Sequence, residues 1–120
     1  MWKKRLASFT YALTGIWTLV RTQPNARIHA LATLMVTLAG LFFDLDRTEW
    51  LFLLLAMALV WATEAINTAL EFLTDLVSPG YHELAGKAKD VAAAAVLICA
   101  FFATITGIVI FLPHVKALFF

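Results

Sequence analysis

Charge is scarce in this sequence, and long stretches of it carry none. Charged residues make up 14% of the 120 residues and apolar residues 62%, whereas soluble domains average about 25% and about 45–50%. The segments 50–63 and 91–113 have no charged residue, and 28–43 has none apart from a protonatable His29. This composition excludes an ordinary soluble domain and indicates an integral membrane protein.

Cysteine and glycine-rich motifs are also nearly absent. The single Cys99 cannot form an intrachain disulfide, and one thiol does not make a metal site. The sequence has no G-x-x-x-x-G-K-[ST], G-x-G-x-x-G or H-E-x-x-H motif, so any nucleotide is bound without a glycine-rich loop. The net charge of +1 does not point to nucleic acid, and we expect no nucleic-acid partner. With no internal repeat, residues 1–120 are expected to form one domain.

Three apolar stretches have the length and composition of membrane-spanning helices. A crossing needs about 20 residues, and we expect spans at about 26–44, 49–76 and 89–112. A Gln-Pro pair separates the first span from a segment at about 2–22, where apolar residues recur every three or four positions. Its basic residues and Trp indicate a surface helix in the headgroup plane, although a helix packed on a protein partner is the alternative. The predicted fold is all-α, with three spans and an N-terminal amphipathic helix.

The Lys and Arg residues are divided unequally between the two ends of these spans. Cytoplasmic segments carry the excess of Lys and Arg, so we expect a cytoplasmic N-terminus and an external C-terminus. Seven residues lie on the first side and two on the second: Lys3, Lys4, Arg5, Arg21, Arg27, Lys87 and Lys89, against Arg47 and Lys116.

A polar stripe, formed by Glu64, Asn67, Glu71 and Asp75, interrupts the second span. On a helix these side chains fall within about 80° of one another, and acids in a span usually serve a function. Counting from Trp50, Glu64 lies about 9 Å inside the cytoplasmic edge of the hydrocarbon and Glu71 lies near that edge. Glu64 suits a general base and Glu71 a ligand for magnesium, while Asn67 would orient a substrate hydroxyl or the Glu64 carboxylate. The alternative is that the stripe joins helices by hydrogen bonds.

A second polar cluster lies between the second and third spans. It contains a Lys that can bind a phosphate and an Asp that can hold a metal or orient the Lys, although a solvated positive-inside loop is the alternative. His29 and His82 are candidate ligands or bases, unless each only hydrogen-bonds a neighbour. The residues alone predict an acid and metal site at the cytoplasmic boundary that acts on something entering from the lipid. The cluster is Tyr81, His82, Glu83, Lys87, Lys89 and Asp90.

Three motifs carry a resemblance to a known family. They are P-N-A-R-I-H at 24–29, E-A-I-N-T-A-L-E-x-x-x-D at 64–75 and Y-H-E-L-A-G-K-A-K-D at 81–90. Together they resemble the bacterial diacylglycerol kinase family, which includes the undecaprenol kinases, over about residues 9–112. The resemblance implies a homotrimer in the bacterial cytoplasmic membrane, with active sites between subunits at the cytoplasmic face. It also implies transfer of the γ-phosphate of magnesium-ATP to a lipid alcohol, either undecaprenol or diacylglycerol.

The resemblance further implies roles for individual residues. Glu64 matches the catalytic base, Asn67 the amide beside it, and Glu71 a metal ligand. Gln23 stands where many members have a second metal-binding Glu, and its amide oxygen can still bind magnesium with one negative charge fewer. The positions matching ATP contacts are Tyr11, Gly80, Tyr81, His82, Lys89 and Asp90, and those expected to contact the lipid are Lys4, Arg27, Glu64 and Ala93. Lys4 stands near an Arg of some members and cannot reproduce a bidentate phosphate contact.

Two other classes of membrane protein compete with this assignment. A small proton-coupled transporter also carries a membrane-embedded Glu, but usually has four spans and places the Glu near mid-membrane. A structural adaptor has no use for a polar stripe.

Within the family, D-V-A-A-A-A-V-L at 90–97 resembles the undecaprenol kinases slightly more than the diacylglycerol kinases.

Overall fold

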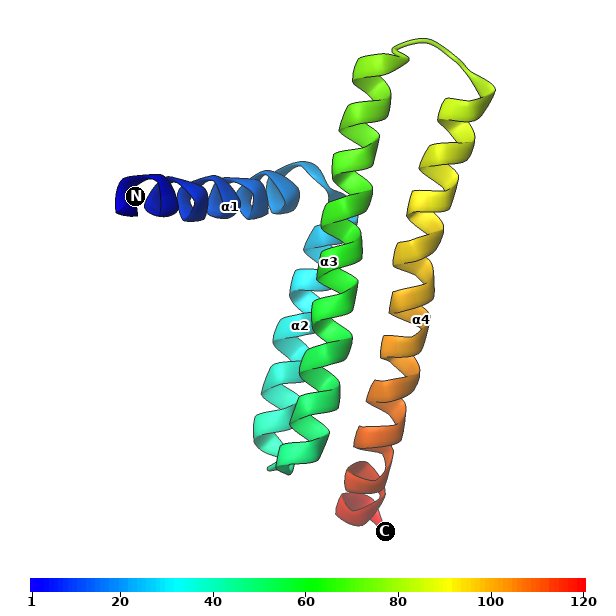
Figure 1. The fold of residues 1–120 in the computed structure, drawn as a ribbon. Coiled ribbons are helices and arrows are strands. Elements are labelled where there is room, and N and C mark those ends of the chain that lie inside the picture. Colours follow the sequence, from blue (N-terminus) through cyan, green and yellow to red (C-terminus); the bar gives the residue numbers. More distant parts are fainter.

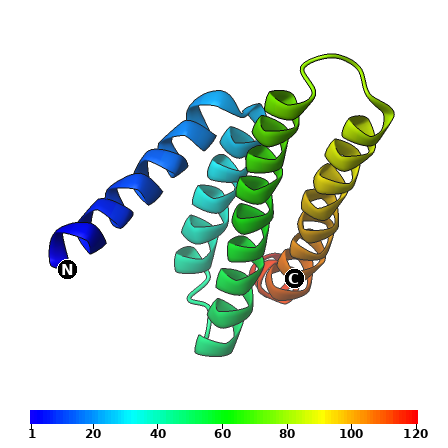
Figure 2. The same cartoon turned by 45° about the horizontal axis from the view of Figure 1, so that its top comes forward.

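The computed structural model describes all 120 residues and contains four α-helices. These are α1 (Trp2–Thr22), α2 (Pro24–Phe42), α3 (Arg47–Val77) and α4 (Glu83–Phe119). The last three are long and apolar enough to cross a membrane, by length and composition. They run side by side, with α3 beside α4, while α1 leaves the bundle to one side (Figures 1 and 2). The prediction of an all-helical fold with three candidate spans is confirmed.

The break between α1 and α2 is held by one side chain. Pro24 opens α2 at a position where its missing N–H costs no helical hydrogen bond. Arg27 then reaches back to α1, and its Nε and Nη2 donate to the carbonyls of Val20 at 3.0 Å and Arg21 at 2.5 Å. Carbonyls in the last turn of a helix lack partners within that helix, so this contact ends α1 and fixes its departure from the bundle. The bounds of α1 agree with the predicted segment, and its position in a headgroup plane stays a prediction.

The turn between α2 and α3 is closely packed. Asp46 and Glu49 form a capping box, in which each side chain accepts from the other residue's backbone N–H at 2.9 Å. Gly40 lies against the Trp50 ring, so closely that a Cβ there would come within 2.6 Å of it. Asp44 adopts a φ of 51°, a conformation that Asp tolerates better than most residues. This turn therefore sets α3 antiparallel to α2.

The last helix is longer than the predicted third span. α4 begins at Glu83 and continues through Pro113 to Phe119, although proline removes a helical hydrogen bond and usually ends or bends a helix. His114, in the turn that follows, contacts Glu49 of α3, with Nε2 and Oε1 2.8 Å apart. This pairing ties the end of α4 to the start of α3.

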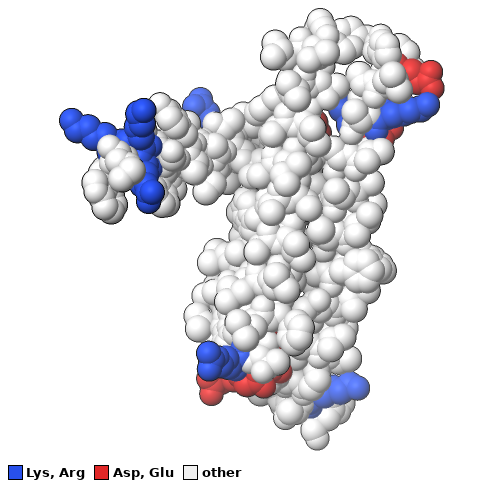
Figure 3. Space-filling model, in the orientation of Figure 1, with Lys and Arg blue, Asp and Glu red and all other residues white.

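Charged side chains gather at the two ends of the bundle and along α1, and the face in Figure 3 shows an uncharged band between them. Such a band is what a bilayer requires of lipid-facing helices. The end that carries α1 and the loop between α3 and α4 is the one predicted to be cytoplasmic. The site described next lies toward that end of α3.

Candidate active site

Buried polar side chains are few, and they lie together on α3. Glu64, Asn67 and Thr68 are the buried polar residues of the chain, and Glu64, at 1% exposed, is its most completely buried large side chain. Burying a carboxyl group costs free energy unless a partner compensates for the lost hydration. Two predicted members of the polar stripe, Glu64 and Asn67, are therefore shielded from water, while Glu71 is half-buried.

His29 of α2 faces the Glu64 carboxyl group. The distance from His29 Nε2 to Glu64 Oε2 is 3.6 Å, which is just beyond a hydrogen bond. Both atoms are buried and neither has a hydrogen-bond partner. The sequence had marked His29 only as one possible ligand or base. Its spacing from Ala26 and Thr33, which puts all three on one face of α2, was the signal that could have placed it toward α3.

Asn67 and Glu71 form the next part of the site. Asn67 Nδ2 donates to Glu71 Oε1 at 3.4 Å, and Asn67 Oδ1 is buried without a partner. Carboxylate and amide oxygens are the ligands that magnesium accepts from proteins, so the donor chemistry around Glu71 fits this ion. No group of three or more His, Cys, Asp or Glu side chains in the chain is arranged to hold a metal. Within one chain Glu71 and Asn67 are therefore candidate oxygen donors and do not form a complete metal site.

Asp75, the last member of the stripe, pairs with α4. Its carboxylate accepts from the Lys89 ammonium group, and both side chains are partly exposed. The sequence left the role of Asp75 open. Its pairing with Lys89 holds the candidate phosphate-binding lysine against the C-terminal end of α3.

Four of the five other predicted ATP contacts, all except Tyr11 of α1, lie in and after the loop between α3 and α4. Tyr81 is 97% exposed, and open space surrounds Gly80. His82 caps α4, because its Nδ1 accepts from the backbone N–H of Leu84 at 3.1 Å. Asp90 is exposed beside Lys89. This loop presents the exposed Tyr81 side chain. The start of α4 after it borders a groove of about 590 Å³ between α3 and α4, whose lining includes Asn67, Leu84 and Lys87.

Several predicted site residues do not join this cluster within one chain. Lys4 is exposed in the first turns of α1, whose free end lies away from α3 (Figure 1). Tyr11 lines a separate groove between α1 and α3, and Ala93 is exposed on α4. The Gln23 amide donates to Thr22 Oγ1 at 3.3 Å and has no hydrogen bond to Glu71. Arg27 caps α1, so its contact with lipid stays a prediction.

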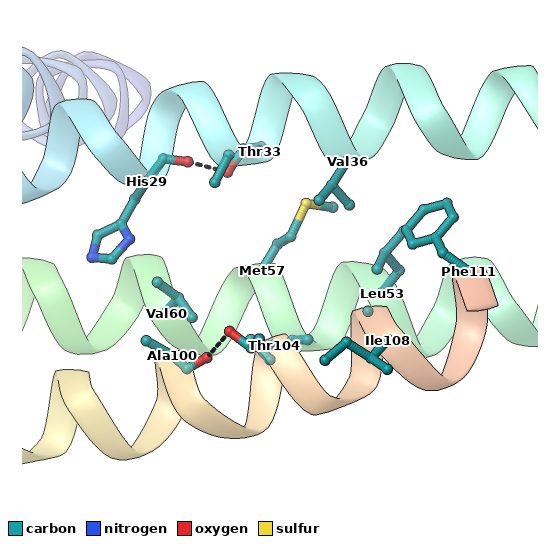
Figure 4. Close-up of a pocket in the computed structure, with 14 residues that line it drawn as sticks. His29, Thr33, Val36, Leu53, Met57, Val60, Ala100, Thr104, Ile108 and Phe111 are labelled. Carbon is teal, nitrogen blue, oxygen red and sulfur yellow. Dashed lines mark hydrogen bonds between the residues drawn. The ribbon is translucent and has the colours of Figure 1, made fainter. Parts of the chain in front are cut away.

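An apolar groove of about 470 Å³ runs between α2, α3 and α4 (Figure 4). His29 lines one end of it and Phe111 the other, with Val60 and Met57 of α3 between them. The groove thus runs from the apolar middle of the bundle to His29, the residue that faces the buried Glu64 carboxyl group. Its lining suits a hydrocarbon chain rather than a polar ligand.

Comparison with known proteins agrees with this geometry. The family model for prokaryotic diacylglycerol kinase matches residues 10–111. The undecaprenol kinase of Bacillus subtilis is 40% identical over 106 residues, which cover 88% of this chain and 86% of that protein. The diacylglycerol kinase of Synechocystis is 42% identical over 94% of this chain and 65% of that protein. The diacylglycerol kinase of Escherichia coli K12 is 34% identical over 73% of this chain and 72% of that protein.

Proposed function

The chain belongs to the prokaryotic diacylglycerol kinase family and is a lipid kinase of the membrane, and from this premise we propose that it transfers the γ-phosphate of magnesium-ATP to the hydroxyl of a membrane lipid alcohol at the Glu64 site. The observation that carries the proposal is the buried Glu64 carboxyl group beside Asn67 and an apolar groove. Membership of the family removes the proton-coupled transporter that the sequence alone left open.

The chemistry asks mainly for positioning and for neutralisation of phosphate charge. Glu64 takes the proton of the lipid hydroxyl as the new oxygen–phosphorus bond forms and ADP leaves with the electrons of the broken bond. Asn67 orients the hydroxyl or the carboxylate, and its amide also supports Glu71. Glu71 and Gln23 would hold the magnesium ion, which supplies charge neutralisation on the ATP phosphates when it is bound.

The nucleotide is assigned to the cytoplasmic end of α3 and α4. Lys89 offers its ammonium group to a phosphate, and Asp75 positions it. Tyr81, His82 and Asp90 lie on the adjoining loop and first turns of α4, where their exposure leaves them free to contact the base or ribose. In this proposal the γ-phosphate lies between this loop and the apolar groove that ends at His29.

The active site is proposed to be completed by a second copy of the chain in a homotrimer. Within one chain Glu71 has a single side-chain hydrogen-bond partner, from α3 itself, and none of Gln23, Tyr11 and Lys4 forms a hydrogen bond with it. Neighbouring copies would supply these residues to each other's sites. We place the trimer in the bacterial cytoplasmic membrane, with α1 on the cytoplasmic surface and the C-terminus outside.

We expect undecaprenol to be the preferred lipid alcohol. The relative from Bacillus subtilis, named an undecaprenol kinase, matches over most of both chains, and the groove beside Glu64 is lined mainly by apolar side chains. The test is transfer of labelled γ-phosphate from ATP in detergent micelles that contain undecaprenol, diacylglycerol or ceramide. We expect kcat/KM for undecaprenol to exceed that for diacylglycerol or ceramide by about tenfold or more, because its chain should fill the apolar groove better than theirs. No turnover with any lipid alcohol would overturn the proposed function, and a preference for diacylglycerol would overturn the choice of lipid alone.

Replacing Gln23 with Glu should tighten magnesium binding. A carboxylate restores one negative charge to the metal shell, and the charge count of the ligands sets affinity for hard cations. We expect the magnesium concentration for half-maximal rate to fall several-fold. Asn25→Asp is the matched control, since it adds the same charge at an exposed position two residues away. An equal response in both variants, or none in Gln23→Glu, would mean that position 23 lies outside the metal shell.

A further inference from the structure

Resting on the proposed function, we propose that His29 is a positioning residue for phosphoryl transfer, which holds the Glu64 carboxyl group and takes up the proton that Glu64 removes from the lipid alcohol. Neither the polar stripe nor the loop after α3 includes this residue. The proposal gives a residue of α2 a part in the proton transfer, which the proposed function attributes to Glu64 of α3 alone.

The geometry of the pair is specific. His29 Nε2 and Glu64 Oε2 lie 3.6 Å apart, with side-chain exposures of 17% and 1%. Neither atom has a hydrogen-bond partner, and no Lys or Arg pairs with Glu64 in the chain. A closer approach of about 0.5 Å would complete the hydrogen bond, and such contacts often tighten only when substrate binds. Each group is thus the other's available partner.

The position of the His29 ring is set by its neighbours. Trp61 of α3 meets it edge-on, with ring centroids 6.5 Å apart, and the Trp61 indole N–H donates to Thr33 Oγ1 at 2.9 Å. Figure 4 shows the ring projecting from α2 toward α3 at the end of the apolar groove. The ring is therefore held against Glu64 and still borders the groove through which the lipid alcohol would enter.

Burial of Glu64 explains why a second group is needed. After transfer the proton of the lipid hydroxyl lies on Glu64, whose Oε2 has no contact with water. In the tautomer with its proton on Nδ1, His29 can accept that proton at Nε2 and become an imidazolium beside a carboxylate. An imidazolium carries a proton on each ring nitrogen, so the ring can then release its Nδ1 proton to water. Glu64 is then a carboxylate again and the ring keeps its proton on Nε2. Exchange of ring protons with water restores the Nδ1–H tautomer before the next turnover, and no other reactant is required.

The test compares two histidine variants in the same lipid phosphorylation assay. His29→Gln keeps a polar side chain of similar reach but cannot carry the proton, and we expect kcat to fall about ten- to a hundredfold, with the KM values for ATP and lipid changed less than about twofold. His114→Gln is the matched control, because it removes the other His–Glu pair, 2.8 Å long, at the opposite end of the bundle, where α4 meets the start of α3. Its kcat should equal that of the wild type.

A chemical rescue separates proton transfer from a merely structural role. His29→Ala leaves a space at the end of a groove of about 470 Å³, and added imidazole should restore about tenfold of the lost kcat. An active wild type with an unchanged kcat in His29→Gln would overturn the role of His29 and leave the kinase intact. A loss of kcat that imidazole does not restore would also overturn it, in favour of packing. An inactive wild type would instead overturn the proposed function on which it rests.

Discussion

Replacing Glu64 with Gln is expected to abolish lipid phosphorylation while the protein stays folded. Glutamine has the shape of glutamate but cannot accept the proton of the lipid hydroxyl, and general bases contribute about 10²–10⁴-fold to rate. We therefore expect kcat to fall about a thousandfold. The carboxyl group is 1% exposed, so a neutral amide costs less to bury, and the unfolding temperature should stay the same or rise.

The measurement combines label transfer with thermal unfolding in detergent. Glu49→Gln is the matched control, because this residue lies in the first turn of the same helix and glutamine can replace it in a capping box. It should keep its activity, and its stability should change little because the glutamine amide can still form a hydrogen bond with His114. Near-normal turnover in Glu64→Gln would show that Glu64 is not the base. Loss of activity together with a lower unfolding temperature in Glu64→Gln would show that the buried Glu64 carboxyl group serves the fold.

Replacing Glu71 with Gln is expected to weaken magnesium binding at the site. The variant keeps an oxygen that accepts from Asn67 Nδ2, as Glu71 Oε1 does at 3.4 Å, but loses one negative charge. Because magnesium is held in such sites by one or two carboxylates together with substrate phosphates, we expect the concentration for half-maximal rate to rise about tenfold or more, and the rate at cellular magnesium levels to fall by a similar factor.

Rates measured against free magnesium at saturating ATP would test this expectation. Glu83→Gln serves as the control, since it removes an exposed carboxylate that pairs only with Lys87 one helical turn away. An unchanged magnesium requirement in Glu71→Gln would remove Glu71 from the metal shell. A lower rate that excess magnesium does not restore would assign it to orientation of Asn67.

Much of the fold follows from local patterns in the sequence. The helical periodicity of residues 2–22 and the Gln-Pro break predicted α1 with its observed bounds, and the three uncharged stretches predicted α2, α3 and α4. The continuation of α4 through Pro113 was not predicted. Proline is a strong local signal for a helix end, and the contact between His114 and Glu49 that accompanies the extension joins residues 65 positions apart.

The candidate site, like the fold, was predicted from the sequence only in part. Helical spacing alone placed Glu64, Asn67 and Glu71 on one face, and the structure brings Asn67 and Glu71 into contact. The partners of Glu64 and Asp75 come from other helices, His29 of α2 and Lys89 of α4. Such pairings depend on helix rotation and packing, which periodicity within one segment does not determine.

The most direct test of the claim that Glu64 serves a lipid kinase is single-turnover transfer of labelled γ-phosphate from magnesium-ATP to undecaprenol in micelles. The wild-type protein is expected to form one labelled lipid phosphate for each ATP consumed, and Glu64→Gln about a thousandfold less in the same time. Folded wild-type protein that labels neither undecaprenol nor diacylglycerol nor ceramide, or a Glu64→Gln variant that labels lipid at the wild-type rate, would contradict that claim.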